Sequence, residues 1–206
     1  MPVTSLDHPL ASHLLSGLRD EQTSPQLFRR LAGTLTTLLA VEATRTIHTQ
    51  SKVVQTPVDK AETQVLAQPV AVVPVLRAGL GMLEPIVQLF PDVTVGYIGL
   101  ERHHDTAVAR SYYCKLPFLG GRFTLCVDPM LATGGSASQA VSLIKAHGGD
   151  PIVMVCVVAA PEGIEKLEQD HPGIQVVTAA IDTRLNELKY IVPGLGDFGD
   201  RLYGTS

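Results

Sequence analysis

Apolar residues follow two different periods along this chain. Short and nearly uninterrupted apolar runs predict strands buried on both faces, and they fall at residues 70–75, 93–99, 123–127, 152–158 and 175–181. Between them, apolar residues recur every three or four positions, which predicts helices over about 10–18, 25–45, 82–90, 137–147 and 160–169. Strands that alternate with helices predict an α/β domain with a central parallel sheet of about five strands, flanked by helices.

The remaining segments are more polar. Residues 46–68 contain one β-like segment, at 52–56, and residues 1–23 are mixed apart from the helical pattern. Arg19, Arg29 and Arg30 belong to the helical segments and are predicted to be solvated. In the tail, residues 190–206, Pro193, Gly194, Gly196 and Gly199 predict irregular structure.

The loop that follows the 123–127 run has the features of an anion site. Asp128 comes directly after the strand, and Thr133-Gly134-Gly135-Ser136 precedes the next helix. Glycines let the backbone approach a ligand closely, and the first N–H groups of a helix attract a phosphate. Asp128 would repel a phosphate, so its carboxylate suits sugar hydroxyl groups, which donate hydrogen bonds.

Two commoner phosphate loops do not match. No lysine follows these glycines, as a P-loop requires, and the one GxGxxG spacing, at Gly194, Gly196 and Gly199, lies too near the chain end to open a βαβ unit. The residues therefore indicate a loop for a phosphate plus a ribose. The alternative is a tight turn between strand and helix that binds nothing.

A second small-residue loop follows the 70–75 run. It reads Leu-Arg-Ala-Gly-Leu-Gly over residues 76–81, and Arg77 carries its only charge. An arginine at the carboxyl end of a parallel strand predicts a bidentate contact to phosphate oxygens. The alternative is a surface arginine beside a turn.

At these loops the chain resembles the uracil phosphoribosyltransferase family. The similar stretches are DPMLATGGS at 128–136, DHPL at 7–10, VPVLRAGLGM at 73–82 and YIVPGLGDFGDRLYGT at 190–205, which together span almost the whole chain. Proline at position 129, where many other phosphoribosyltransferases have a second acidic residue, is similar to the uracil branch. The resemblance implies a type I phosphoribosyltransferase-like fold with a hood hairpin at residues 99–121 and a C-terminal base-binding flap at 190–206.

The resemblance also implies a reaction and a set of site residues. Uracil and 5-phospho-α-D-ribose 1-diphosphate (PRPP) would give UMP and diphosphate, in pyrimidine salvage. Asp128, Arg102 and Asp197 are the expected catalytic residues. The PRPP contacts implied are Arg77, Arg102, Asp128, Pro129, Met130, Leu131, Ala132, Thr133, Gly134, Gly135, Ser136 and Asp197, and the uracil contacts are Ile191, Gly196, Asp197 and Phe198. Mg²⁺ is expected to arrive mainly as the Mg–PRPP complex, with no metal held by a dedicated protein site.

This sequence departs from the family pattern at two places. His103 and His104 stand where acidic hood residues are expected, which changes how the hood could treat Mg²⁺ or pH. Adjacent histidines in a polar loop are more often solvated than metal-bound, since no third ligand is spaced to join them. Phe198 stands where many members have alanine, so its ring could narrow the base pocket or stack on the base, while a main-chain contact would survive.

Composition sets the remaining bounds. The chain has 206 residues, 45% of them apolar, and this predicts one globular domain over residues 1–206. A net charge of −4 offers no basic face for nucleic acid, and the longest apolar run, 152–160, is too short to span a membrane. Cys126 and Cys156 lie in apolar runs and are expected to be buried reduced thiols. With no signal segment at its start, the protein is predicted to be cytoplasmic.

Three hypotheses stay open on the sequence alone. The first is the enzyme just described, for which the family implies a homodimer or larger oligomer and allows GTP as an effector. The second is a catalytically idle sensor that binds UMP or PRPP and regulates a partner. The third is an enzyme of the same fold that acts on another base, since only the resemblance assigns the tail to uracil.

Overall fold

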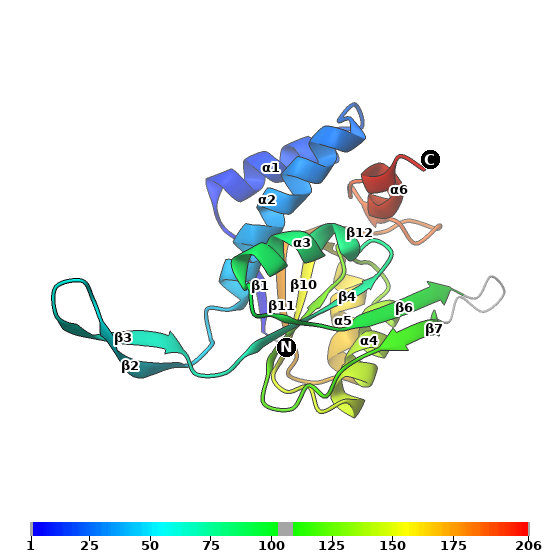
Figure 1. Cartoon of the computed structure of the whole chain (residues 1–206). Coiled ribbons are helices and arrows are strands. Elements are labelled where there is room, and N and C mark those ends of the chain that lie inside the picture. The colour runs from blue at the N-terminus through cyan, green and yellow to red at the C-terminus, as the bar shows by residue number, and fades with distance from the viewer. Residues whose placement is uncertain (1, 103–108, 206) are drawn as a thin grey trace.

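The structure is a computed structural model that describes residues 2–102 and 109–205. Its main sheet is parallel except at one edge (Figure 1). In spatial order the main strands are β1 (Val3–Ser5), β11 (Gln175–Ile181), β10 (Ile152–Ala159), β8 (Phe123–Val127), β4 (Val70–Leu76), β6 (Tyr97–Arg102) and β7 (Ala109–Lys115). Two short strands join it, β5 (Thr94–Val95) beside β4 and β9 (Met130–Leu131) beside β10.

The predicted fold class is confirmed, and the parallel part of the sheet also contains two short strands that were not expected, β1 and β9. Each of the five apolar runs lies in the parallel sheet, and the run at 93–99 is divided between β5 and β6. Of these, β1 pairs with β11 in the register Val3 with Val176. Strands this short show no period, so the sequence pattern could not reveal them.

Helices cover both faces of the sheet and make two cores. The helices α1 (Pro9–Arg19), α2 (Pro25–Ala43) and α3 (Leu80–Leu89) lie on one face, and α4 (Gly135–Ala146) and α5 (Pro161–Asp170) on the other (Figure 1). Along β4, Val70 and Val72 pack into the first core, while Ala71 and Val73 pack into the second. This alternation is the period of two that a strand imposes, and it explains why every residue of the run is apolar.

The long helix α2 begins as its sequence predicts. The Ser24 hydroxyl caps it by accepting a hydrogen bond from Leu27 N, and Pro25 occupies the first turn. The prediction of solvated arginines is confirmed for Arg29 and Arg30, which are exposed, and is wrong for Arg19, which is partly buried. Arg19 forms an ion pair with Asp182, and Arg29 Nη1 donates to the carbonyl of Leu202 at 2.7 Å. These partners lie far along the chain, so no local pattern indicates them.

A separate antiparallel hairpin projects from the body of the domain (Figure 1). It consists of β2 (Thr49–Gln55) and β3 (Lys60–Leu66), where the sequence pattern predicts only one β-like segment, at 52–56. Most residues of both strands are exposed, so neither strand needs an apolar face. A strand without a buried face loses the alternation by which strands are recognised.

The chain ends in short elements above the carboxyl edge of the sheet. These are β12 (Arg184–Leu185), β13 (Ile191–Val192) and α6 (Phe198–Tyr203). The prediction of an irregular tail is wrong for α6. Asp197 caps the start of that helix through Asp200 N, Gly204 ends it in the left-handed region, and Phe198 and Leu202 bury one side. Among the residues described here, no helix is long and apolar enough to cross a membrane.

Candidate active site

The two small-residue loops open at the same edge of the sheet. β4 and β8 are parallel neighbours, with Pro74 opposite Val127, so the Arg77 turn and the Asp128 turn leave the sheet side by side. A cavity of about 450 Å³ lies there. It is lined by Ala78, Leu100, Asp128, Met130, Leu131, Ala132, Thr133, Gly134, Ser136, Ala137, Leu188, Lys189, Tyr190, Ile191, Gly196, Asp197, Phe198 and Gly199.

The Thr133–Ser136 loop has a conformation that requires glycine. Gly134 precedes α4 with φ of 79°, in the left-handed region, and a Cβ there would lie 2.7 Å from the Gly163 carbonyl oxygen. A Cβ on Gly163 would in turn lie 2.5 Å from the Ala132 carbonyl oxygen. The first turn of α5 therefore packs directly against this loop. The start of α4 is left facing the cavity, where its N–H groups and the helix dipole favour an anion.

Asp128 is half-buried at the cavity and directly follows β8. Its N–H donates to the carbonyl of Val155 at 3.2 Å, which anchors its backbone to the neighbouring strand. Two buried free thiols lie nearby in the sheet, Cys126 and Cys156, as expected. Burial, aided by the Asp128 charge, raises the pKa of both, to about 12 for Cys156. These thiols stay protonated at neutral pH and offer no nucleophile.

Arg77 leaves β4 at the rim of the cavity, and its side chain is 65% exposed. Its Nη2 atom lies 4.0 Å from Asp200 Oδ1 on α6. The Tyr203 hydroxyl donates to the Arg77 carbonyl at 3.3 Å, and burial raises the pKa of that phenol. The neighbouring Ala78 lines the cavity, whereas Arg77 does not.

Other predicted PRPP contacts differ in their placement. The Pro129 carbonyl accepts hydrogen bonds from Val157 N and Val158 N, so this residue ties the loop to β10 and does not line the cavity. Gly135 is the first residue of α4 and does not line it either. Arg102 ends β6 in the backbone trace, but its side chain lies outside the described residues, as do His103 and His104.

All four predicted uracil residues reach the cavity from the tail. Asp197 also caps α6, because its Oδ1 accepts from Asp200 N at 2.9 Å. The Phe198 ring is 1% exposed and meets Phe28 edge to face at 5.1 Å between centroids. The ring packs in the core against Phe28 while the residue also lines the cavity, so its effect on the base pocket stays a prediction.

Sequence reasoning missed several lining residues. They include Ala78, Leu100, Ala137, Leu188, Lys189 and Gly199, whose side-chain types carry no signal of their own. Leu188 and Lys189 lie in the turn between β12 and β13, and Lys189 has φ of 66°. Glu162 at the start of α5 accepts a hydrogen bond from Leu185 N at 2.9 Å, which lowers the pKa of its carboxyl and attaches that turn to α5.

Comparison with known proteins agrees with this arrangement. The family model described as uracil phosphoribosyltransferase matches residues 5–205. Uracil phosphoribosyltransferases of Symbiobacterium thermophilum and Thermus thermophilus are each 48% identical to the chain, over 98% of both chains in the first case and 100% in the second.

Solved structures show the same fold. The AQ2163 protein of Aquifex aeolicus superposes with a TM-score of 0.94 at 36% identity, over 99% of each chain. A hypoxanthine phosphoribosyltransferase of Staphylococcus aureus, at 10% identity, a TM-score of 0.52 and 76% of each chain, shares the type I phosphoribosyltransferase-like fold alone. The whole-length match, together with a cavity between two loops and a glycine-rich tail, assigns this chain to the uracil phosphoribosyltransferase family.

Proposed function

We propose that the chain catalyses the transfer of the phosphoribosyl group of PRPP to uracil, which gives UMP and diphosphate and serves pyrimidine salvage. The observation that carries this proposal is one cavity onto which the Asp128 loop, the start of α4 and the C-terminal tail converge. PRPP has a phosphate at one end, a ribose in the middle and a diphosphate at the other end. The two loops and the tail offer an anion site, a carboxylate and a set of main-chain groups in one enclosure.

The ribose phosphate end is held by the Asp128 loop. The N–H groups of Thr133–Ser136 bind the 5′-phosphate at the start of α4, with the turn at Met130, Leu131 and Ala132 as the adjoining wall. Asp128 accepts hydrogen bonds from the ribose hydroxyls. As the C1–diphosphate bond breaks, the sugar carbon becomes cationic, and the Asp128 carboxylate stabilises that charge. Positioning and electrostatics suffice, and no covalent nucleophile is needed.

The leaving diphosphate is neutralised by Arg77, Arg102 and Mg²⁺. Among residues 2–102 and 109–205, no group of three or more His, Cys, Asp or Glu side chains could hold a metal ion. Mg²⁺ commonly binds through one or two carboxylates together with substrate phosphates, which fits Asp128 and Asp197 at the cavity. Asp128 and Asp197 would hold the metal when it arrives with the substrate as Mg–PRPP, and it would supply positive charge for the leaving group.

The base is read by the tail. Uracil presents alternating donors and acceptors at its edge, and main-chain groups of Ile191, Gly196 and Phe198 pair with them. Uracil N1 forms its bond to the sugar carbon as the C1–diphosphate bond breaks, and the Asp197 carboxylate at the cavity accepts the N1 proton or would help to hold the metal. Cytosine is rejected, because an unpaired buried polar group costs about 1–3 kcal/mol.

Three further features are part of the proposal. The hairpin at residues 99–121 closes over bound ligand and keeps water from the sugar carbon. The protein acts as a homodimer or larger oligomer, as the family resemblance implies. GTP activates it. Light scattering coupled to gel filtration tests the assembly, and assays with added GTP test the effector.

A panel of nucleobases tests the reaction itself. The protein is incubated with PRPP and Mg²⁺ plus uracil, cytosine, adenine, guanine or hypoxanthine, and nucleoside monophosphates are separated by chromatography. UMP is expected from uracil alone. A product from another base would favour the third hypothesis, and tight UMP binding without turnover of any base would favour the sensor.

The Arg77→Ala variant is expected to lose about 1.5–3 kcal/mol of transition-state binding, the worth of a charged hydrogen bond to the diphosphate. Because Arg77 lies at the rim, its loss should change stability little. kcat/KM for PRPP measures the effect, and the control is Arg30→Ala, because Arg30 is exposed and does not line the cavity. An unchanged kcat/KM in Arg77→Ala would remove Arg77 from the mechanism.

The Gly134→Ala variant is expected to lose at least about 1–2 kcal/mol of stability, since a Cβ at φ of 79° is strained and meets the Gly163 carbonyl. The shifted loop should also raise KM for PRPP. Gly173→Ala is a matched control, because Gly173 has φ of 85° with open space around it. Urea unfolding and PRPP kinetics should give a strain cost in both variants but a KM change in Gly134→Ala alone. Equal KM values for PRPP in the two variants would show that the Thr133–Ser136 loop does not contribute to PRPP binding.

A further inference from the structure

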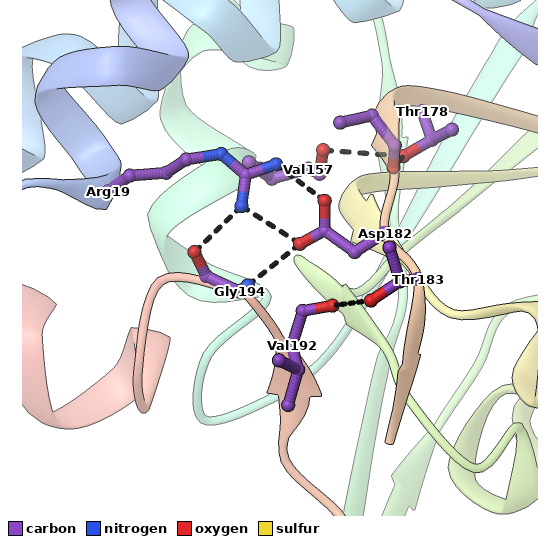
Figure 2. Close-up of polar contacts among 8 residues, drawn as sticks. Arg19, Val157, Thr178, Asp182, Thr183, Val192 and Gly194 are labelled. Atoms are coloured by element: carbon purple, nitrogen blue, oxygen red, sulfur yellow. Dashed lines mark hydrogen bonds and ion pairs between the residues drawn. The ribbon is translucent and has the colours of Figure 1, made fainter. Parts of the chain in front are cut away.

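Arg19 and Asp182 form a partly buried ion pair behind the base-binding tail (Figure 2). Arg19 is the last residue of α1, and Asp182 directly follows β11. Arg19 Nη1 and Nη2 donate to the two carboxylate oxygens at 2.8 and 2.6 Å, which is the bidentate geometry. The Asp182 side chain is 5% exposed, so this charge is almost removed from water.

Both members of the pair hold one residue of the tail, Gly194. Gly194 N donates to Asp182 Oδ2 at 2.8 Å, and the Gly194 carbonyl accepts from Arg19 Nη1 at 2.7 Å (Figure 2). Thr183 adds a third attachment, because its hydroxyl and its N–H both donate to the Val192 carbonyl, at 2.8 and 3.0 Å. The turn after β13 is therefore held through its main chain on both sides.

A second arginine attaches the next residue to the same end of α1. Arg201 Nη1 donates to the carbonyls of Leu195, at 2.8 Å, and Leu18. Its guanidinium group also lies over the Phe28 ring, 4.6 Å from the centroid. Gly194 and Leu195 thus connect to the end of α1, and they lie in sequence between Ile191 and Gly196, which line the cavity.

Stability alone gives a weak reason for such a pair. Removing two charges from water costs about as much as their attraction returns, and an apolar replacement is often neutral or stabilising. A bidentate pair with two main-chain contacts to one glycine does something an apolar pair cannot, which is to set the position of that backbone. A site that reads a base through main-chain groups depends on this, because displacements of about 1 Å break the pairing.

We propose that Arg19 and Asp182 are positioning residues for the base, which set the 191–197 turn so that its main chain meets uracil. This inference rests on the proposed function. The PRPP half of the cavity is built separately, on β8 and the start of α4. Asp197 is the one expected PRPP contact in the turn, and its side chain is held independently by capping α6 through Asp200 N. Loss of the pair should therefore weaken uracil binding much more than PRPP binding.

The test compares the two KM values in four variants. In Arg19→Ala and Asp182→Asn, KM for uracil is expected to rise about tenfold, with KM for PRPP within about twofold of the original. Arg19→Lys keeps a charge but loses the bidentate contact, so its KM for uracil should fall between those of the original protein and Arg19→Ala. The double variant Arg19→Ala/Asp182→Ala should raise KM for uracil no further than Arg19→Ala does, because both residues act on one turn.

Two controls separate positioning from stability. Arg45→Ala removes an exposed ion pair with Glu42, remote from the tail, and Val153→Ala removes core volume at the start of β10. Melting temperatures are measured for every variant. The inference is overturned if KM for uracil and KM for PRPP rise together in Arg19→Lys, in proportion to the fall in melting temperature that Val153→Ala also shows. In that case the pair only stabilises the fold.

A binding measurement distinguishes this failure from failure of the proposed function. If the original protein makes no UMP, titration calorimetry with UMP and with PRPP still compares the two halves of the cavity. A selective loss of UMP affinity in Arg19→Lys then supports positioning without the reaction. An original protein that neither forms nor binds UMP overturns both proposals.

Discussion

Replacing Asp128 by asparagine is expected to lower kcat/KM for PRPP by about a hundredfold to a thousandfold, since two charged hydrogen bonds to ribose, each worth about 1.5–3 kcal/mol, are weakened or lost. kcat should fall as well, because the negative charge of the carboxylate stabilises the cationic sugar carbon in the transition state. Asparagine has nearly the same shape, and Asp128 is only half-buried, so the fold should survive. Initial rates with varied PRPP at saturating uracil measure the effect.

The matched control for this variant is Asp92→Asn. Asp92 is an exposed aspartate between α3 and β5, at the amino edge of the sheet and away from the cavity. Its loss should leave kcat/KM for PRPP unchanged. Near-normal kinetics in Asp128→Asn would contradict the ribose contact and, with it, the central electrostatic role in the mechanism.

Replacing Phe198 by alanine is expected to lower the free energy of unfolding by about 3–5 kcal/mol, the cost of emptying a buried aromatic site. The ring is 1% exposed and packs edge to face on Phe28. The ring also explains why residue 81 of α3 is glycine. A Cβ at that position would lie 3.2 Å from the Phe198 ring and 2.7 Å from the Leu202 side chain. Urea denaturation measures the loss of stability. KM for uracil should rise in the same variant, because Gly196 and Asp197 directly precede α6 and depend on its position.

Phe118→Ala is the control for this second prediction. Phe118 is 77% exposed, so its truncation should change stability by no more than about 0.5 kcal/mol. An unchanged unfolding free energy in Phe198→Ala, with a selective rise in KM for uracil, would show that the ring contacts the base and does not stabilise the core.

Local patterns predicted the elements that combine a strong period with recognisable ends. The buried strands were identified because both faces of the sheet are covered, so nearly every position is apolar. The α2 helix was identified by its period and its Ser24–Pro25 start. The Asp128 loop was identified because glycine and hydroxyl residues directly follow a buried strand, and the structure brings most of that loop to the cavity.

The errors have physical causes that lie outside local patterns. β1 is too short to show a period, and β2 and β3 have no buried face to produce one. In the tail, glycines at positions 194, 196 and 199 obscured α6, whose ends are set by Asp197 and Gly204. The packing of the Phe198 ring on Phe28 could not be predicted either, because the two residues are remote in sequence.

The amino-acid sequence by itself determined the buried strands, the main helices and the two loops whose residues suit phosphate and ribose, because these properties depend on residues close together in the chain. Only the tertiary structure decided that the Arg77 turn and the Asp128 turn share one edge, since strand order depends on how β4 and β8 pair. It also decided that Arg19 is the partner of Asp182, 163 positions away. Such a pair forms only after folding has brought α1 and the end of β11 together, so no periodicity or motif in the sequence predicts it.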